Sequence, residues 1–134
     1  MQAGIATTIG LVVLIAGLPQ LSAAEPLVTD HMQMRTVGGD IVIGLYGEIA
    51  PQHVAQIKRL IAAEVYDRTH FYRTLPGFYI QTSHHLDRPR PLTRSQRQLV
   101  KPIPDEFSDV PHQKWTVTMA RQPDSPNSAE ASLI

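Results

Sequence analysis

Two stretches of alternating apolar and polar residues, joined by a glycine turn, restrict the possible folds of this chain more than any other feature. The alternation runs over residues 32–36 and resumes over residues 41–45, with Gly38, Gly39 and Asp40 between them. Such alternation is typical of a strand with one buried face. Glycine tolerates the positive φ that a tight turn between two strands requires. The sequence therefore predicts an antiparallel β-hairpin.

A helical period follows this hairpin. Pro51 suits the first turn of a helix, and Val54, Ile57 and Ile61 then recur at helical spacing. We expect one amphipathic helix of about three turns that packs by its apolar stripe. It should end near Ala63, although no glycine stop signal marks that end.

The rest of the chain offers further strand signals and one long polar stretch. Aromatic and branched residues between positions 71 and 82 flank the turn signal Pro76-Gly77, which predicts two strands or one sharply bent strand. Residues 83–100 are polar and are expected to form a long surface loop. Residues 115–121 alternate again, which predicts a last strand. Short strands with one helix favour a mainly antiparallel β architecture, either a barrel or a sandwich.

The composition narrows the classes of function without selecting one. The chain has 134 residues and a formal net charge of +0 at pH 7, so we expect one globular domain and no binding of nucleic acid. The arginines of residues 88–97 are spread through the polar stretch and are interpreted as a solvated loop. Cysteine is absent, which excludes disulfides, zinc–thiolate sites and cysteine nucleophiles.

The N-terminal residues have the pattern of an export signal. From Ile5 to Leu18 the chain is apolar or small and uncharged, and small residues at 22–24 then form a cleavage pattern. The run is too short for a comfortable membrane span. We interpret residues 1–24 as a signal peptide, with an uncleaved anchor as the alternative, and residues 25–134 as the mature domain. This predicts a periplasmic or secreted protein without stable membrane association after cleavage.

Four motifs along the chain suggest a family. They are Gly39–Tyr46 with Ala50-Pro51; Phe71-Tyr72-Arg73 with Pro76–Gln81; Ile103–Phe107; and Met119-Ala120-Arg121 with Pro126–Ala129. In this order they resemble the cyclophilin family of peptidyl-prolyl cis-trans isomerases over about residues 32–134. The resemblance implies a mainly β fold, a cyclophilin-like antiparallel β-barrel with one packed amphipathic helix.

The resemblance also implies a set of site residues. Arg73 matches the principal catalytic arginine, which hydrogen-bonds the prolyl residue. The implied substrate-binding residues are Phe78, Tyr79, Gln81, Met119, Ala120, Arg121 and Ile134. Among these, Phe78 and Met119 match the floor of an apolar pocket for the proline ring, and Gln81 matches a side chain that holds the substrate carbonyl and supports the arginine. Ala120 and Arg121 match backbone contacts to the residue before proline, Ile134 matches a pocket wall, and Tyr79 lies beside the pocket.

The implied chemistry requires no cofactor and no metal. Rotation about a peptide bond breaks amide resonance, a barrier of roughly 20 kcal/mol, and an enzyme needs only to bind the twisted amide better than the planar forms. The expected partners are proline-containing, unfolded or partly folded polypeptides. The adjacent His84 and His85 point in different directions in regular structure, so no metal site is expected. Ser83 and Ser125 lack the glycines of a nucleophile elbow, which argues against a hydrolase.

Several positions depart from the family pattern. Tyr72 stands where histidine is most frequent, and Tyr79 replaces a smaller apolar residue. Trp115 stands where glycine is usual, and Ile134 is followed by no further residue. We therefore expect a barrel that is incomplete at the C-terminus, in a truncated product, a frameshifted product or a fragment. The main hypothesis is an exported, bacterial, monomeric prolyl isomerase, and the alternative is a non-catalytic module that binds proline-containing segments.

Overall fold

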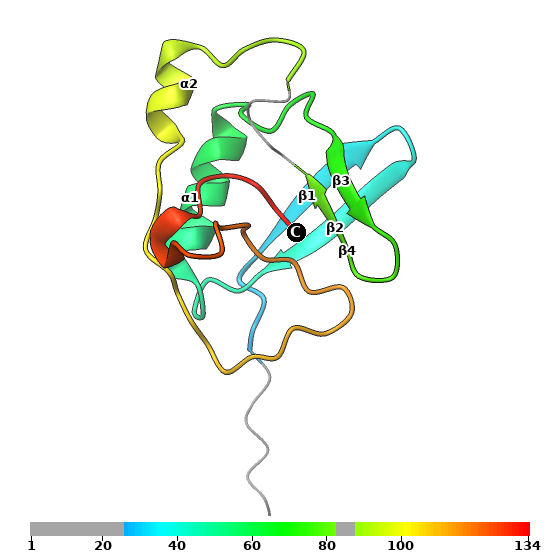
Figure 1. Cartoon of the computed structure of the whole chain (residues 1–134), viewed down its shortest axis with the longest axis vertical. Coiled ribbons are helices and arrows are strands. Elements are labelled where there is room, and N and C mark those ends of the chain that lie inside the picture. Colours follow the sequence, from blue (N-terminus) through cyan, green and yellow to red (C-terminus); the bar gives the residue numbers. More distant parts are fainter. Residues whose placement is uncertain (1–25, 83–87) are drawn as a thin grey trace, which may run out of the picture.

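The structure, a computed structural model, describes residues 26–82 and 88–134 (Figure 1). The expected signal peptide and the histidine pair at 84 and 85 lie outside these residues. The elements are β1 (Asp30–Thr36), β2 (Gly39–Leu45), α1 (Pro51–Ala62), β3 (Phe71–Leu75), β4 (Tyr79–Thr82), α2 (Arg94–Leu99) and the short 3-10 helix η1 (Pro126–Ser128). None of the helices in the described ranges is both long and apolar enough to cross a membrane.

Strands β1 and β2 form the predicted antiparallel hairpin, which is therefore confirmed. Asp30 lies opposite Leu45, and Thr36 lies opposite Gly39 at the turn. Gly39 has a φ of 123°, a conformation that side-chain-bearing residues rarely adopt. The Thr36 hydroxyl closes the turn, because it accepts from the backbone N–H of Gly38 at 3.1 Å and donates to the Gly39 carbonyl at 2.7 Å.

The predicted helix is confirmed as α1, and Pro51 occupies its first turn. Its apolar stripe differs from the expected one at a single position. Leu60 is fully buried, whereas Ile61 is 41% exposed. The buried Gln56 lies one turn before Leu60, so the face that packs on the core is rotated toward these two residues and Ile61 falls on its flank.

Strands β3 and β4 form a second antiparallel hairpin, so the stretch is two strands rather than one bent strand. Pro76 and Gly77 are the central residues of its turn. Gly77 has a φ of 75°, and the Phe78 N–H donates to the Leu75 carbonyl at 3.0 Å. Proline followed by a residue with positive φ is the arrangement of a type II turn. The sequence signal at Pro76-Gly77 thus specified the turn correctly.

A β-bulge interrupts the pairing of β3 with β4. Phe71 lies opposite Thr82 and Arg73 lies opposite Gln81, so Tyr72 is the extra residue on β3. A bulge bends its strand and redirects the side chain of the extra residue. This irregularity has no signal in the sequence.

The C-terminal residues extend the second sheet by isolated bridges. Leu133 pairs with Thr82 at the end of β4 on one side and with Met119 on the other. The Thr82 N–H donates to the Leu133 carbonyl at 2.9 Å, and the Ala120 N–H donates to the Ser132 carbonyl at 2.7 Å. Residues 132–134 therefore lie between β4 and residues 118–120, as the red C-terminal segment shows in Figure 1.

The predicted last strand over residues 115–121 is wrong. Within this run only residues 118–120 are paired, with residues 132–134, through the bridge at Met119. Trp115 has a φ of 76°, which breaks an extended run at its first residue. The Thr116 N–H donates to the Gln113 carbonyl at 3.0 Å, so the chain turns there instead of extending.

The expectation of a loop over residues 83–100 is also wrong in part, because α2 lies within it. Thr93 caps this helix, since its hydroxyl accepts from the Gln96 N–H at 3.2 Å while the Gln96 side-chain oxygen accepts from the Thr93 N–H at 2.9 Å. This reciprocal pair is a capping box. Gln96 Nε2 also donates to the Ala63 carbonyl at 2.8 Å and attaches α2 to the end of α1.

The core consists of two clusters, and α1 contributes residues to both. The first comprises Met32, Leu45, Val54, Ile57 and Leu133, and the second comprises Leu60, Val65, Leu92 and Ala131. Tyr66 packs against both. Residues 26–82 and 88–134 thus form two two-stranded antiparallel sheets with packed helices, which confirms the mainly β prediction. The described residues contain no closed barrel, and the expected barrel that is incomplete at the C-terminus stays a prediction.

Candidate functional site

The predicted catalytic residue, Arg73, lies on β3 directly opposite Gln81 on β4. Residues directly opposite in an antiparallel pair project to the same face of the sheet. The Arg73 side chain is exposed, whereas Gln81 is only 8% exposed. The hairpin therefore presents a solvent-accessible cation beside a nearly buried amide.

One aromatic ring, that of Tyr79, adjoins the Arg73 guanidinium, and a second ring, that of Phe78, contacts Tyr79. Its Cζ lies 5.3 Å from the centroid of the Tyr79 ring, within the range of a cation–π interaction. The Tyr79 ring meets the Phe78 ring edge to face, with centroids 5.4 Å apart and planes at 61°. Phe78 itself is 80% exposed. The turn of the β3–β4 hairpin thus carries an apolar ring that is exposed to water, and the Tyr79 ring connects it to the Arg73 guanidinium.

A serine hydroxyl joins the hairpin to the C-terminal segment. Gln81 Nε2 lies 3.1 Å from Ser132 Oγ, and the Tyr72 hydroxyl lies 3.0 Å from the same atom. Ser132 Oγ donates to the Thr82 carbonyl at 3.0 Å. The sequence predicted Gln81 but not Ser132 or the Tyr72 hydroxyl. Local sequence patterns give no signal for these contacts, because Ser132 is 51 residues from Gln81 and 60 residues from Tyr72 along the chain.

Three other predicted site residues lie on the paired C-terminal segments. Met119 is half-buried and packs against the first core cluster. The Ala120 N–H is taken by the Ser132 carbonyl, and the Ile134 N–H by the Thr118 carbonyl at 2.9 Å. The Ala120 N–H is therefore not free to bond a peptide, and the role of Ala120 in substrate binding stays a prediction. The role of Ile134 as a pocket wall stays a prediction.

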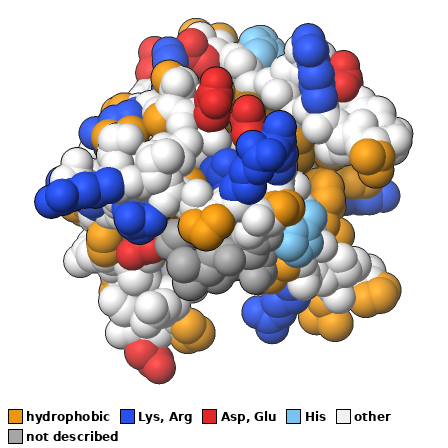
Figure 2. All heavy atoms as spheres, turned by 90° about the horizontal axis from the view of Figure 1, so that it is seen from above, with side chains coloured by type: hydrophobic (Ala, Val, Ile, Leu, Met, Phe, Trp, Pro, Cys, Tyr) orange, Lys and Arg blue, Asp and Glu red, His pale blue; other side chains and the backbone are white. Residues whose placement is uncertain are grey.

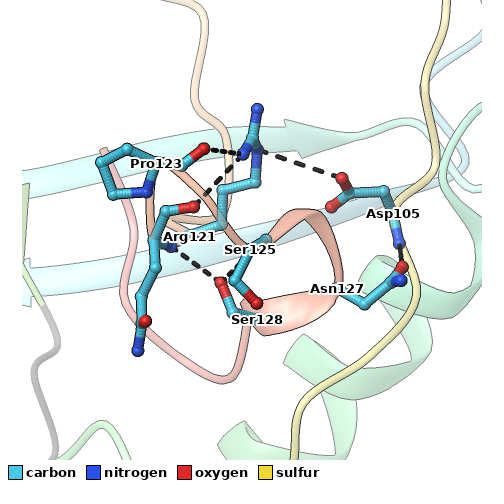
Figure 3. A network of polar contacts seen from close by, with 7 residues as sticks. Asp105, Arg121, Pro123, Ser125, Asn127 and Ser128 are labelled. Atoms are coloured by element: carbon cyan, nitrogen blue, oxygen red, sulfur yellow. Dashed lines mark hydrogen bonds and ion pairs between the residues drawn. The ribbon is translucent and has the colours of Figure 1, made fainter.

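The side chain of Arg121 turns into its own loop (Figure 3). Its Nη1 donates to the carbonyls of Gln122 at 3.2 Å and Pro123 at 3.1 Å, and its Nε lies 4.0 Å from Asp105 Oδ2. The Asp105 N–H donates to Asn127 Oδ1 at 2.9 Å. The third and fourth sequence motifs therefore hold each other in place, and the Arg121 side chain stabilises this junction.

A charged recess lies elsewhere on the surface. It is lined by Glu64, Asp67, Arg68, Arg88 and Arg90. The lining thus contains two acidic and three basic side chains. Figure 2 shows the upper face of the molecule, where acidic and basic side chains are intermixed rather than gathered in a continuous patch of one charge. The recess is thus chemically unlike an apolar proline pocket. Within residues 26–82 and 88–134, no cluster of three His, Cys, Asp or Glu side chains could hold a metal ion.

Within residues 26–82 and 88–134, the pKa values of two titratable groups, Tyr66 and Glu106, are shifted from their ordinary values. Burial raises the pKa of the Tyr66 hydroxyl, which belongs to the core. Burial also favours a higher pKa for Glu106, but hydrogen bonds from the backbone N–H groups of His53 and Gln52 and from the His53 side chain outweigh it, so the net pKa is lowered. Neither group adjoins Arg73 in the pairing of β3 with β4.

Comparison with known proteins identifies similar chains. The family model described as cyclophilin type peptidyl-prolyl cis-trans isomerase/CLD matches residues 31–132. A probable peptidyl-prolyl cis-trans isomerase of Brucella suis is 33% identical over 126 residues, which cover 90% of this chain and 63% of the relative. The peptidyl-prolyl cis-trans isomerase CYP23 of Arabidopsis thaliana is 36% identical over 117 residues, 86% of this chain and 49% of the relative. The chain thus spans less than two thirds of the length of these relatives.

Proposed function

Because the chain belongs to the cyclophilin-type peptidyl-prolyl cis-trans isomerase family, we propose that it accelerates rotation about X-Pro bonds in unfolded or partly folded polypeptides. The observation that carries the proposal is the placement of Arg73 directly opposite Gln81, with its guanidinium over the Tyr79 ring. This arrangement puts a fixed donor and an amide on one accessible face of the β3–β4 hairpin.

The proposed mechanism is preferential binding of the twisted imide. When the X-Pro bond rotates, resonance is lost and the imide nitrogen becomes a hydrogen-bond acceptor. The planar, permanently charged guanidinium of Arg73 donates to that nitrogen and stabilises the twisted state more than either planar isomer. Preorganised donors of this kind supply several kcal/mol without a nucleophile or a cofactor.

The proposed apolar contacts of the proline ring come from Phe78 and Met119. Phe78 is 80% exposed, whereas Met119 is half-buried and packs against the first core cluster. A bound prolyl ring would remove apolar area of Phe78 from water, which favours binding in proportion to the area covered. Tyr79 contributes to catalysis indirectly, because the contact of its ring with Arg73 restricts the conformations of the catalytic guanidinium.

The proposal includes export of a monomer. Residues 1–24 would act as a signal peptide, and the product would reach the periplasm of a bacterium or the medium. Support comes from the uncharged run Ile5–Leu18 and from the small residues before Glu25. Cell fractionation followed by N-terminal sequencing of the recovered protein tests this part. A cytoplasmic product that retains residue 1 would contradict it.

The activity is tested by following cis-to-trans relaxation of a proline peptide with the purified chain and with Arg73→Ala. The expected kcat/KM of the variant is about 100-fold lower, the usual cost of one preorganised donor. Arg35→Ala is the matched control, because Arg35 is an exposed arginine on β1 in the other sheet. Equal activity of the chain and Arg73→Ala would overturn the mechanism. Peptide binding without acceleration would favour a non-catalytic proline-binding module, for which the exposed Phe78 is also suited.

A further inference from the structure

The hydrogen bonds of the Ser132 hydroxyl can be assigned by counting protons. A serine hydroxyl has one proton to donate and two lone pairs to accept with. The Thr82 carbonyl, 3.0 Å away, can only accept, so it takes the single proton of Ser132. The contacts from Gln81 at 3.1 Å and from Tyr72 at 3.0 Å must then both donate to Ser132. The proton and both lone pairs of the Ser132 hydroxyl are therefore used in hydrogen bonds.

This count fixes the orientation of the Gln81 amide. If the amide were flipped, its oxygen would face a hydroxyl that has no proton left to give. Nε2 therefore points to Ser132, which leaves one amide proton and Oε1 for other partners. Arg73 lies directly opposite on the same face, so Oε1 is the acceptor available to a guanidinium N–H and the remaining proton is available to a peptide carbonyl.

The bulge explains how Tyr72 takes part. In regular pairing, Tyr72 would project to the face opposite Arg73. Tyr72 is the extra residue between the pairs Phe71–Thr82 and Arg73–Gln81, and the bulge redirects its side chain. Its hydroxyl consequently reaches the same serine as Gln81, although Ser132 is 60 residues away along the chain.

We propose that Tyr72 and Ser132 are positioning residues that hold the Gln81 amide in one orientation toward Arg73 and the peptide. The inference rests on the proposed isomerase function and deepens it, because it names two residues that act through Gln81. Neither residue has to touch the substrate. Their hydroxyl groups set which atom of Gln81 faces the reacting bond.

The first test uses the free protein and requires no activity. The side-chain amide resonances of Gln81, identified by their loss in Gln81→Glu, are followed by NMR in Ser132→Ala and Tyr72→Phe. Each variant removes one hydroxyl. Both are expected to shift the Gln81 amide protons upfield, Ser132→Ala by the larger amount, because the direct acceptor is lost. Tyr46→Phe is the control, since Tyr46 precedes α1 and lies outside the β3–β4 hairpin. Unchanged Gln81 resonances in both variants would overturn the inference, whatever the catalytic activity.

The second test separates positioning from a purely structural role. In exchange kinetics with a proline peptide, kcat is expected to fall about three- to tenfold in Ser132→Ala and Tyr72→Phe, with KM nearly unchanged. Ser132→Thr restores a hydroxyl and should recover most of the kcat. If both variants alter the Gln81 resonances but leave kcat unchanged, Tyr72 and Ser132 are not positioning residues. If the unaltered chain shows no acceleration, the proposed function fails, while the NMR result still decides the orientation of Gln81.

Discussion

At the level of single residues, the position of the Arg73 guanidinium depends on the ring of Tyr79. A flexible side chain loses rotamer freedom when it donates to a peptide, and this loss opposes binding. The contact at 5.3 Å with the Tyr79 ring restricts the side chain before a peptide arrives. The edge-to-face contact with Phe78 in turn restricts the Tyr79 ring. The turn residues Pro76 and Gly77 directly precede Phe78 and Tyr79 and set the backbone positions from which the two rings extend.

This contact predicts different effects for two substitutions of Tyr79. Tyr79→Phe keeps the aromatic face and should leave kcat/KM within about twofold. Tyr79→Leu removes it and should lower kcat/KM about two- to fivefold, in line with 0.5–1 kcal/mol for exposed cation–π contacts. Relaxation of the proline peptide provides the measurement. Equal values for the two variants would show that the ring does not position Arg73.

At the level of elements, α1 is capped from a distant part of the chain. Ala50 at its N-terminus provides no side-chain cap. Instead, the Glu106 carboxylate accepts from the backbone N–H groups of Gln52 at 2.8 Å and His53 at 2.9 Å, and from the His53 ring at 2.6 Å. A carboxylate at this end also interacts favourably with the helix dipole. The motif Ile103–Phe107 therefore caps α1 through Glu106, in addition to its contact with the fourth motif through Asp105.

Substitution of Glu106 should destabilise the fold in a pH-dependent way. Glu106→Gln removes the charge and is expected to cost about 1 kcal/mol near neutral pH, the usual value of an N-cap or of a charge at a helix N-terminus. The folded-state pKa of Glu106 lies below its ordinary value of 4.5. Its contribution is therefore fully present above that value and is lost as the pH falls through the folded-state pKa.

Denaturant unfolding followed by far-UV circular dichroism at several pH values provides the measurement for this cap. The difference between the unaltered chain and Glu106→Gln should shrink as the medium is acidified. Glu48→Gln serves as a matched control, because Glu48 precedes α1 and has no contact with its N-terminus among the described hydrogen bonds. A difference that does not depend on pH would contradict the role of the charge.

At the level of the whole molecule, one buried amide joins three parts of the chain. Gln56 on α1 is fully buried, and its Nε2 donates to the Leu99 carbonyl at 2.9 Å and to the Glu130 carbonyl at 3.2 Å. Its Oε1 accepts from Arg59. The end of α2 and the segment before Ser132 are thus held against the same helix. These bonds connect the core to the C-terminal segment, whose Ser132 contacts Gln81.

Gln56→Leu should therefore destabilise the whole fold. It removes the buried donor to the carbonyls of the half-buried Leu99 and Glu130 and the acceptor of Arg59, which is expected to cost about 2–4 kcal/mol. Gln52→Leu on the exposed face of the same helix should cost less than about 0.5 kcal/mol. Chemical denaturation with circular dichroism compares the two variants. Similar losses for both would contradict the linking role of Gln56.

The sequence predicted the elements whose signals are local. Alternation around Gly39 and the helical period after Pro51 each depend on neighbouring residues, and both elements were confirmed. Helix α2 escaped prediction because none of its residues is buried and its signal is only the capping box at Thr93. The run from Trp115 to Arg121 has a strand pattern, but a strand also needs a partner along its length.

In the candidate site, too, the sequence indicated only the residues that lie within a local motif. Arg73 and Gln81 lie in a motif that the resemblance covers, and the hairpin places them opposite each other. Ser132 could not be predicted as their support, because its role depends on a bulge at Tyr72 and on contacts between residues 50 or more positions apart. Propensity and spacing carry no information about such contacts. They arise only when the chain has packed.

The exposure of Trp115 determines what an optical experiment on this protein can report. It is the chain's single tryptophan, it is 86% exposed, and the Lys114 ammonium lies 5.0 Å from its ring centroid. Its emission in the native state is therefore already close to that of an indole in water, and unfolding of the core will change it little. Tryptophan fluorescence will instead report on local changes in the loop that carries Trp115.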